Sequence, residues 1–206
     1  MPNLEEHVLP NGVKVLFDPD EHKYFVDGEE VPSITTLLQA HYGNKYAMVR
    51  PEILEASAKY GTNVHAELEH YINLRKKDPN TEIVSQYDEV KNYFEFVEPI
   101  YKINPIMTEK VVVLYGPDGK VAAAGRFDLF CTVDGKPTLA DFKTTSSINR
   151  QSVSAQLNLY LTGMLQSGYV DDISNIGLGV IHLSGMKSTY TPLTKFADNF
   201  YLTFVI

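Results

Sequence analysis

The sequence predicts a single α/β domain in which a mixed central β-sheet is flanked by helices and preceded by a small N-terminal β unit. Two long extended runs face each other across Asp134-Gly135, a strong turn signal, as expected of a hairpin. A continuous apolar run at residues 176–183 is typical of a strand in a sheet covered on both faces. With 206 residues, 44% of them hydrophobic, the chain can bury one good core and is short for two domains.

The N-terminal unit is expected to span residues 1–45, and the core of the domain residues 46–206. Residues 13–32 are predicted to be short strands joined by turns, because Asp, Pro and Gly, which favour turns, recur in this segment. Ser33 is expected to cap a short helix that runs through Leu38, since its hydroxyl can accept from the first free backbone N–H groups.

Four further helices are predicted from apolar residues that recur at helical spacing. The first covers residues 51–77, with an interruption or kink near Gly61. The second covers about residues 81–101 and carries an apolar and aromatic stripe that we expect in the core, formed by Val84, Tyr87, Val90, Phe94 and Val97. The last two cover residues 152–167 and 195–206.

Three extended runs precede the third of these helices. The first is residues 106–115, and the hairpin follows with residues 121–133 and 137–145. Side chains alternate along a strand, so Asp141 and Lys143 are predicted to share one face while the residue between them points to the other.

Asp128 lies thirteen positions before Asp141, on the partner strand of the hairpin, and the two carboxylates are therefore expected to share a cation. Hard oxygen ligands suit Mg²⁺, which is usually held by one or two carboxylates together with substrate phosphate. An ammonium group such as that of Lys143 would stabilise negative charge that develops on phosphorus when water attacks it.

An alternative for Asp141 and Lys143 is the solvated face of a half-exposed sheet, which is the commoner reason for an acid and a lysine two residues apart on a strand. The hairpin is apolar enough on both faces to indicate a central position, and a buried acid needs a partner or a metal. These two residues alone leave the alternatives evenly balanced, so other motifs must decide.

Two helical pairs supply those motifs. His65 and Glu69 are four residues apart and project from one helix face, after a Gly-Thr pair. Gln156 and Tyr160 have the same spacing on a later helix. A single helical histidine is usually structural or solvated, whereas one paired with Glu upstream of two acids is a candidate metal ligand or phosphate contact.

In this order, the motifs Gly61-Thr-x-x-His65-x-x-x-Glu69, Gly125-x-x-Asp128, Asp141-x-Lys143 and Gln156-x-x-x-Tyr160 resemble the four signatures of the PD-(D/E)XK nucleases, in their RecB-like, phage-exonuclease branch. The segment that starts at Tyr24-Phe-Val-Asp-Gly is similar to the lead-in of phage-encoded members. One departure is Asp141, where many relatives have Glu; the shorter side chain would shift the metal slightly.

The resemblance implies a restriction-endonuclease-like core and a role for each motif residue. His65, Asp128 and Asp141 would bind Mg²⁺ or Mn²⁺, and Lys143 would assist the attacking water. Gln156 and Tyr160 would hold DNA or order the catalytic groups. Three further residues would lie in the second shell or contact DNA: Glu69, Glu109 and Arg126. Arg126 has an alternative role as a salt-bridge partner of Glu109.

A net charge of −8 argues at first against binding nucleic acid, whose affinity depends on cations meeting phosphates. A local patch matters more than the total, and bound metal neutralises catalytic acids. The candidate cations are Lys45, Arg50, Lys59, Arg75, Lys76, Lys77, Arg126 and Arg150.

The composition is typical of an intracellular enzyme, and a cytoplasmic location is expected. A single cysteine, Cys131, excludes an intrachain disulfide and a four-cysteine iron–sulfur cluster. No apolar run is long enough for a membrane span, the N-terminus is too acidic for a secretory signal, and no phosphate-binding loop of the GxxxxGK[ST] type occurs.

Together these features predict a metal-dependent deoxyribonuclease, by resemblance an exonuclease of phage or prophage recombination or repair. Its partners would be DNA and a phage single-strand annealing or recombination protein. Two alternatives remain open at this point: a DNA-binding or assembly module that has lost turnover, and an endonuclease with the same catalytic residues.

Overall fold

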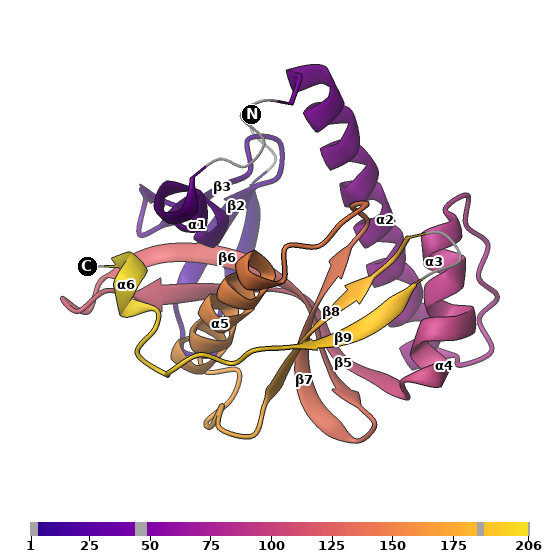
Figure 1. The fold of residues 1–206 in the computed structure, drawn as a ribbon. Coiled ribbons are helices and arrows are strands. Elements are labelled where there is room, and N and C mark those ends of the chain that lie inside the picture. The colour runs from indigo at the N-terminus through magenta and orange to yellow at the C-terminus, as the bar shows by residue number, and fades with distance from the viewer. Residues whose placement is uncertain (1–3, 44–48, 185–187, 206) are drawn as a thin grey trace.

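The computed structural model describes residues 4–43, 49–184 and 188–205. The fold is α/β, with a mixed five-stranded sheet, a four-stranded antiparallel sheet and flanking helices, which confirms the predicted class (Figure 1). The predicted boundary between residues 45 and 46 lies outside the described residues, as does Lys45.

The N-terminal sheet contains β1 (Glu5–Val8), β2 (Lys14–Asp18), β3 (Lys23–Val26) and β4 (Glu29–Val31), each antiparallel to its neighbour. Its inner face packs on the long strands of the larger sheet, and the buried residues in contact include Val15, Phe17, Tyr24, Val111 and Ala124. The unit therefore shares a core with the rest of the chain.

Ser33 caps α1 (Ile34–Tyr42) as predicted: the Ser33 hydroxyl accepts from the Thr36 amide at 3.0 Å. The helix is longer than the sequence suggested, and it ends at Gly43, whose amide donates to the Gln39 carbonyl.

The larger sheet has the order β5 (Ile103–Tyr115), β6 (Val121–Val133), β7 (Lys136–Lys143), β8 (Gly177–His182) and β9 (Thr189–Leu193). β7 and β8 are parallel, and every other neighbouring pair is antiparallel. The hairpin turn between β6 and β7 has positive φ at both central residues, 47° at Asp134 and 80° at Gly135, which is the backbone that Asp-Gly favours. β9 was not predicted.

Helices cover both faces of this sheet (Figure 1). One face packs against α5 (Arg150–Gln166) and α1, and the other against α2 (Pro51–Lys77), α3 (Asp88–Asn92) and the π-helical turn η1 (Tyr93–Val97), which continues into α4 (Glu98–Ile100). Strand β7 illustrates the division, because Leu139 packs beneath α5 while Ala140 and Phe142 pack beneath α2.

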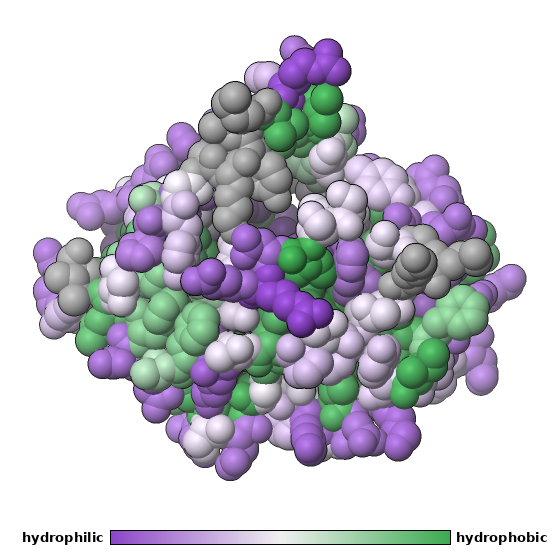
Figure 2. Space-filling model, in the orientation of Figure 1, coloured by the Kyte–Doolittle hydropathy of each residue, from purple (hydrophilic) through white to green (hydrophobic). Residues whose placement is uncertain are grey.

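Helix α2 was predicted to break or kink near Gly61, but it is helical without interruption from Pro51 to Lys77. Gly61 is an ordinary helical residue, where a side chain would meet only the Thr144 hydroxyl, at 3.5 Å. The first turns of α2 project beyond the body of the molecule, which exposes a mixture of hydrophilic and hydrophobic residues on the face shown in Figure 2.

The helix predicted for residues 81–101 begins only at Asp88. The preceding segment is held against α2 by side chains, since the Tyr71 hydroxyl donates to the Val84 carbonyl and the Ser85 hydroxyl donates to Glu67. Val84, counted as part of the apolar stripe, is 72% exposed.

The predicted helix at residues 195–206 is also wrong for most of its length, because only α6 (Leu202–Val205) is α-helical. Asn158 explains the difference: its side-chain oxygen accepts from the Phe196 amide at 2.8 Å, and its nitrogen donates to the Thr194 carbonyl at 3.0 Å. These bonds fix the chain in an irregular path. None of the helices that the structure describes combines the length and the apolar character needed to cross a lipid bilayer.

Candidate active site

Strand register brings three acids into one row across the larger sheet. Leu129 pairs with Ala140, so Asp128 and Asp141 occupy the next opposed positions on β6 and β7. On the other side of β6, the pairs Thr108–Leu129 and Lys110–Phe127 put Glu109 of β5 opposite Asp128. The separation of Asp128 and Asp141 in the sequence, with the hairpin turn between them, therefore follows from this pairing of the strands.

The three acids line a cavity of about 360 Å³ between the larger sheet, α2, α5 and the N-terminal sheet. All nine residues singled out from the sequence border this cavity: His65, Glu69, Glu109, Arg126, Asp128, Asp141, Lys143, Gln156 and Tyr160. The four motifs, spread over about a hundred residues, therefore meet at one place.

Asp128 is fixed from two directions. Its carboxylate accepts from the Phe142 amide at 2.7 Å, and the Nδ1 atom of His65 lies 3.6 Å from the same oxygen. Burial alone would lower the pKa of His65, but the negatively charged Asp128 carboxylate outweighs it and raises that pKa to about 9. Burial opposes ionisation of Asp128, yet His65 and Lys143 hold its pKa below the usual value.

Asp141 and Lys143 form a close ion pair, with 2.6 Å between the lysine Nζ and a carboxylate oxygen. Asp141 is only 3% exposed, so the solvated-surface alternative is wrong for this acid. Burial and the neighbouring Asp128 raise the pKa of Asp141 to about 6, although Lys143 opposes the shift. Neighbouring carboxylates with pKa values shifted in opposite directions are typical of a functional site.

Glu109 has an unusual backbone for a residue inside a strand, with φ of 48°. Such a left-handed conformation costs roughly 1–3 kcal/mol for a residue other than glycine, and Glu109 lines the cavity. Its oxygen lies 2.8 Å from the Nε atom of Arg126, which is the salt bridge that the sequence left as an alternative. Burial and Asp128 raise the pKa of Glu109 to about 8, despite Arg126.

The donor set fits a divalent cation. One ligand atom each from His65, Glu109 and Asp128 lie within 4.8 Å of one another. Around Mg²⁺, ligand atoms at 2.0–2.1 Å lie roughly 2.9 Å apart when they are adjacent and roughly 4.2 Å apart when they are opposite, so the three side chains must move closer together to bind one ion. A cation would also relieve the unfavourable burial that raises the pKa values of Glu109 and Asp141. Glu109 thus belongs to this cluster, which its predicted second-shell role did not imply, whereas Asp141, a predicted metal ligand, lines the same cavity but is not one of the three residues.

No protein-family model matches this chain, and no curated protein matches it. Among solved structures, one titled "Crystal structure of SSO0001" is similar to it, with a TM-score of 0.46 and 16% sequence identity. The similarity covers 86% of this chain and 73% of that one.

The N-terminal sheet contributes residues to the cavity that the sequence did not identify. Phe17, His22 and Tyr24 line its wall, and the Arg126 guanidinium lies over the Phe17 ring at 5.0 Å. Nothing local indicates a site, because Phe17 in β2 and Tyr24 in β3 occupy buried positions of alternating strands, and His22 lies in the turn between these strands. Their role depends on how two sheets pack together.

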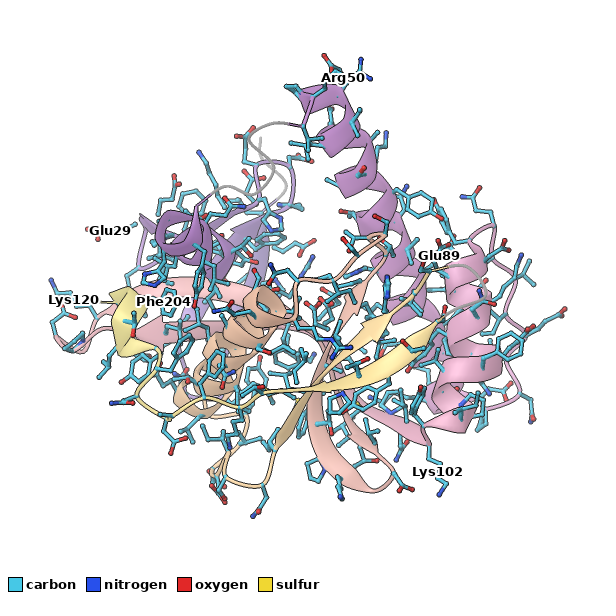
Figure 3. The ribbon with its side chains drawn as sticks, viewed as in Figure 1. Glu29, Arg50, Glu89, Lys102, Lys120 and Phe204 are labelled. Carbon is cyan, nitrogen blue, oxygen red and sulfur yellow. The ribbon has the colours of Figure 1, made fainter. Side chains whose placement is uncertain are left out.

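Only one of the candidate DNA-binding cations in the described part of the chain borders the cavity, namely Arg126. Arg50 lies at the projecting tip of α2 (Figure 3). Arg75 is engaged in a salt bridge, and Lys76 donates to a backbone carbonyl. The broad basic patch considered from the sequence is therefore not assembled around this cavity.

Gly125 is required by close packing against the cavity. A β-carbon there would lie 2.7 Å from the Tyr160 ring and 3.1 Å from Ile34. We expect Gly125→Ala to lower the free energy of unfolding by about 1–3 kcal/mol, because overpacking must displace an element. Thermal unfolding checks this, with Gly61→Ala as the control, since alanine there favours the helix. Equal stability of the two variants would contradict this interpretation of the glycine motif.

Tyr160 and Gln156 form the polar part of α5 at the cavity, where the Gln156 amide donates to the Tyr160 hydroxyl at 3.3 Å. Burial raises the pKa of that hydroxyl, so it remains protonated. We expect Tyr160→Phe to reduce roughly tenfold the DNA cleavage that is predicted from the sequence, and Gln156→Ala similarly, with stability changed by less than about 1 kcal/mol. Cleavage rates and melting curves test this, with Tyr169→Phe as the control. Full activity in both variants would make the Q-x-x-x-Y match accidental.

Proposed function

We propose that the protein is a metal-dependent deoxyribonuclease with a PD-(D/E)XK fold, which hydrolyses phosphodiester bonds in DNA. The observation that carries the proposal is the convergence of Asp128, Asp141 and Lys143 on one cavity, beside His65. These groups come from two strands and a helix and are largely buried, so their proximity is built into the core. An exonuclease of phage or prophage recombination, or of repair, is the role that resemblance favours.

Hydrolysis of a phosphodiester requires that a water be oriented for attack and that charge on the phosphate oxygens be stabilised. Lys143 can do both from the cavity wall, where its side chain is 27% exposed and anchored by Asp141. Gln156 and Tyr160 offer an amide and a hydroxyl from α5 in the same cavity. Glu109 holds Arg126 at the rim, where a guanidinium can contact a flanking phosphate.

His65, Asp128 and Asp141 would hold Mg²⁺ or Mn²⁺. His65 and Asp128 form a cluster of ligand atoms with Glu109, and Asp141 lines the same cavity. A bound divalent cation supplies electrostatic stabilisation of the phosphate that is being attacked. Carboxylate oxygens suit both ions, and an imidazole nitrogen favours Mn²⁺ over Mg²⁺. Because His65 is protonated next to Asp128, it must lose its proton before it can bind an ion.

The proposal is tested by incubating the purified protein with end-labelled linear DNA and with covalently closed circular DNA, in Mg²⁺, Mn²⁺ or EDTA. We expect linear DNA to be degraded in either metal and left intact in EDTA. Release of label from the ends with closed circles intact identifies an exonuclease, and nicking of the circles an endonuclease. A folded protein that leaves every substrate intact in both metals would refute the nuclease function.

A further inference from the structure

A second cavity of about 240 Å³ adjoins the candidate active site. It lies between α1, the start of α5 and the segment that follows β7, and its walls include Thr35, Gln39, Tyr42, Thr145, Ser147 and Ser152. We call this space the side groove. It shares Lys143 and Gln156 with the catalytic cavity, so a strand lying in it would lead directly to the cleavage position.

The charge of the side groove differs from that of the rest of the site. Glu69 and Glu109 line the catalytic cavity in addition to the two aspartates, and the whole chain carries a net charge of −8. Among the described residues that line the side groove, none is acidic, and Lys143 is the single cation. Hydroxyl and amide groups make up most of its polar surface. A polyanion meets least repulsion along this path.

The size of the side groove fits one strand. Its volume is below the roughly 300–1,000 Å³ of sites for drug-sized ligands, so about one nucleotide at a time can occupy it. Tyr42, which is 38% exposed, forms part of one wall and offers a ring on which a base can stack.

The opposite wall is held in place by its own bonds. The Thr145 hydroxyl donates to the Ser147 carbonyl at 3.0 Å, and His182 Nε2 lies 2.7 Å from the Thr145 carbonyl. Asn149 accepts from the Ser152 amide at 2.9 Å, which fixes the start of α5. The wall that faces Tyr42 is therefore fixed, and the Ser147 and Ser152 side chains border the groove.

We infer that the side groove binds single-stranded DNA and receives the nucleotide next to the scissile phosphate, with its base against Tyr42. The inference rests on the proposed function, because it takes the cavity at Lys143 as the place of cleavage. It adds the substrate form, a single strand, and the route by which that strand reaches the metal.

The test measures binding rather than cleavage. Fluorescence anisotropy of a labelled oligodeoxythymidylate is recorded with the full chain in Ca²⁺ and in EDTA, and a blunt duplex of equal length serves as the comparison. Gln39→Glu adds one negative charge at nearly constant size, and we expect it to raise the Kd for the single strand about fivefold. Tyr42→Ala removes the stacking ring and should raise the Kd by roughly 5-fold to 100-fold.

Gln86→Glu is the matched control, since it makes the same change at an exposed residue outside both cavities and should leave the Kd unchanged. The inference would be overturned if both groove variants bound the single strand with wild-type affinity, or if they lost as much affinity for the blunt duplex. It would also be overturned if the wild type did not bind the single strand. A loss of affinity that is seen only in the groove variants, and only for the single strand, supports the inference. If that pattern appears in a protein that cuts no DNA, the groove is a binding site and the nuclease proposal alone has failed.

Discussion

Asp128→Asn and Asp141→Asn should each reduce DNA cleavage by ~10³-fold or more, the largest effects that we expect from single substitutions. Each change removes one ligand charge and almost no volume. Asn can still accept the Phe142 amide bond that Asp128 accepts at 2.7 Å, so the strands stay in register. Cleavage of end-labelled linear DNA in saturating Mg²⁺ and Mn²⁺ measures the loss, and near-normal turnover in either variant would remove that residue from the site.

The two variants should differ in stability when EDTA removes metal. At pH 8 the Asp141 carboxylate is ionised in both folded and unfolded chains, but its raised pKa means that folding disfavours the charge. Asp141→Asn should therefore melt at the same temperature as the wild type or higher. Asp128 has a lowered pKa because His65 and Lys143 favour its ionised form, so Asp128→Asn should lose roughly 1–2 kcal/mol.

Asp198→Asn is the control for both measurements, because this acid is exposed and does not line the cavity. It should cleave and melt like the wild type. Two active-site variants with the same melting temperature would show that the opposed pKa shifts of the neighbouring carboxylates do not describe the metal-free protein.

The hairpin could be predicted because residues close together in the sequence determine it. Asp134-Gly135 supplies the two positive φ values of the turn, and the alternation on either side then fixes which residues oppose each other. The positions of Asp128 and Asp141 follow from that register alone. For the same reason, the helix pair Gln156 and Tyr160 was expected on one face of a helix, and both line the cavity.

Features that depend on tertiary contacts could not be predicted in this way. The role of Glu109 arises from the pairing of β5 with β6 and from a left-handed backbone that no pattern in the sequence indicates. The segment at residues 81–87 has helical periodicity, yet hydrogen bonds to α2 outweigh its intrinsic preference. Asn158 likewise imposes an irregular path on the residues after β9.

Lys143→Ala should lower the rate of the chemical step by ~10²-fold, the usual cost of losing an electrostatic or acid–base group. The ammonium lies 2.6 Å from the Asp141 carboxylate, faces both cavities and is the one cation of the side groove among its described lining residues. It is a candidate for charge stabilisation and is not among the expected metal ligands. Metal affinity, measured by thermal shift against Mn²⁺ concentration at pH 8, should stay nearly unchanged.

The matched control is Lys136→Ala, which removes an exposed lysine from the other end of the same strand, β7. Single-turnover cleavage separates the chemical step from DNA binding, so a loss confined to that step identifies Lys143 as a catalytic residue. A raised Kd for DNA with an unchanged single-turnover rate would instead assign Lys143 to strand binding in the side groove. If both lysine variants cleave like the wild type, Lys143 serves only to pair with a buried acid, and the strongest support for phosphodiester chemistry at this site is lost.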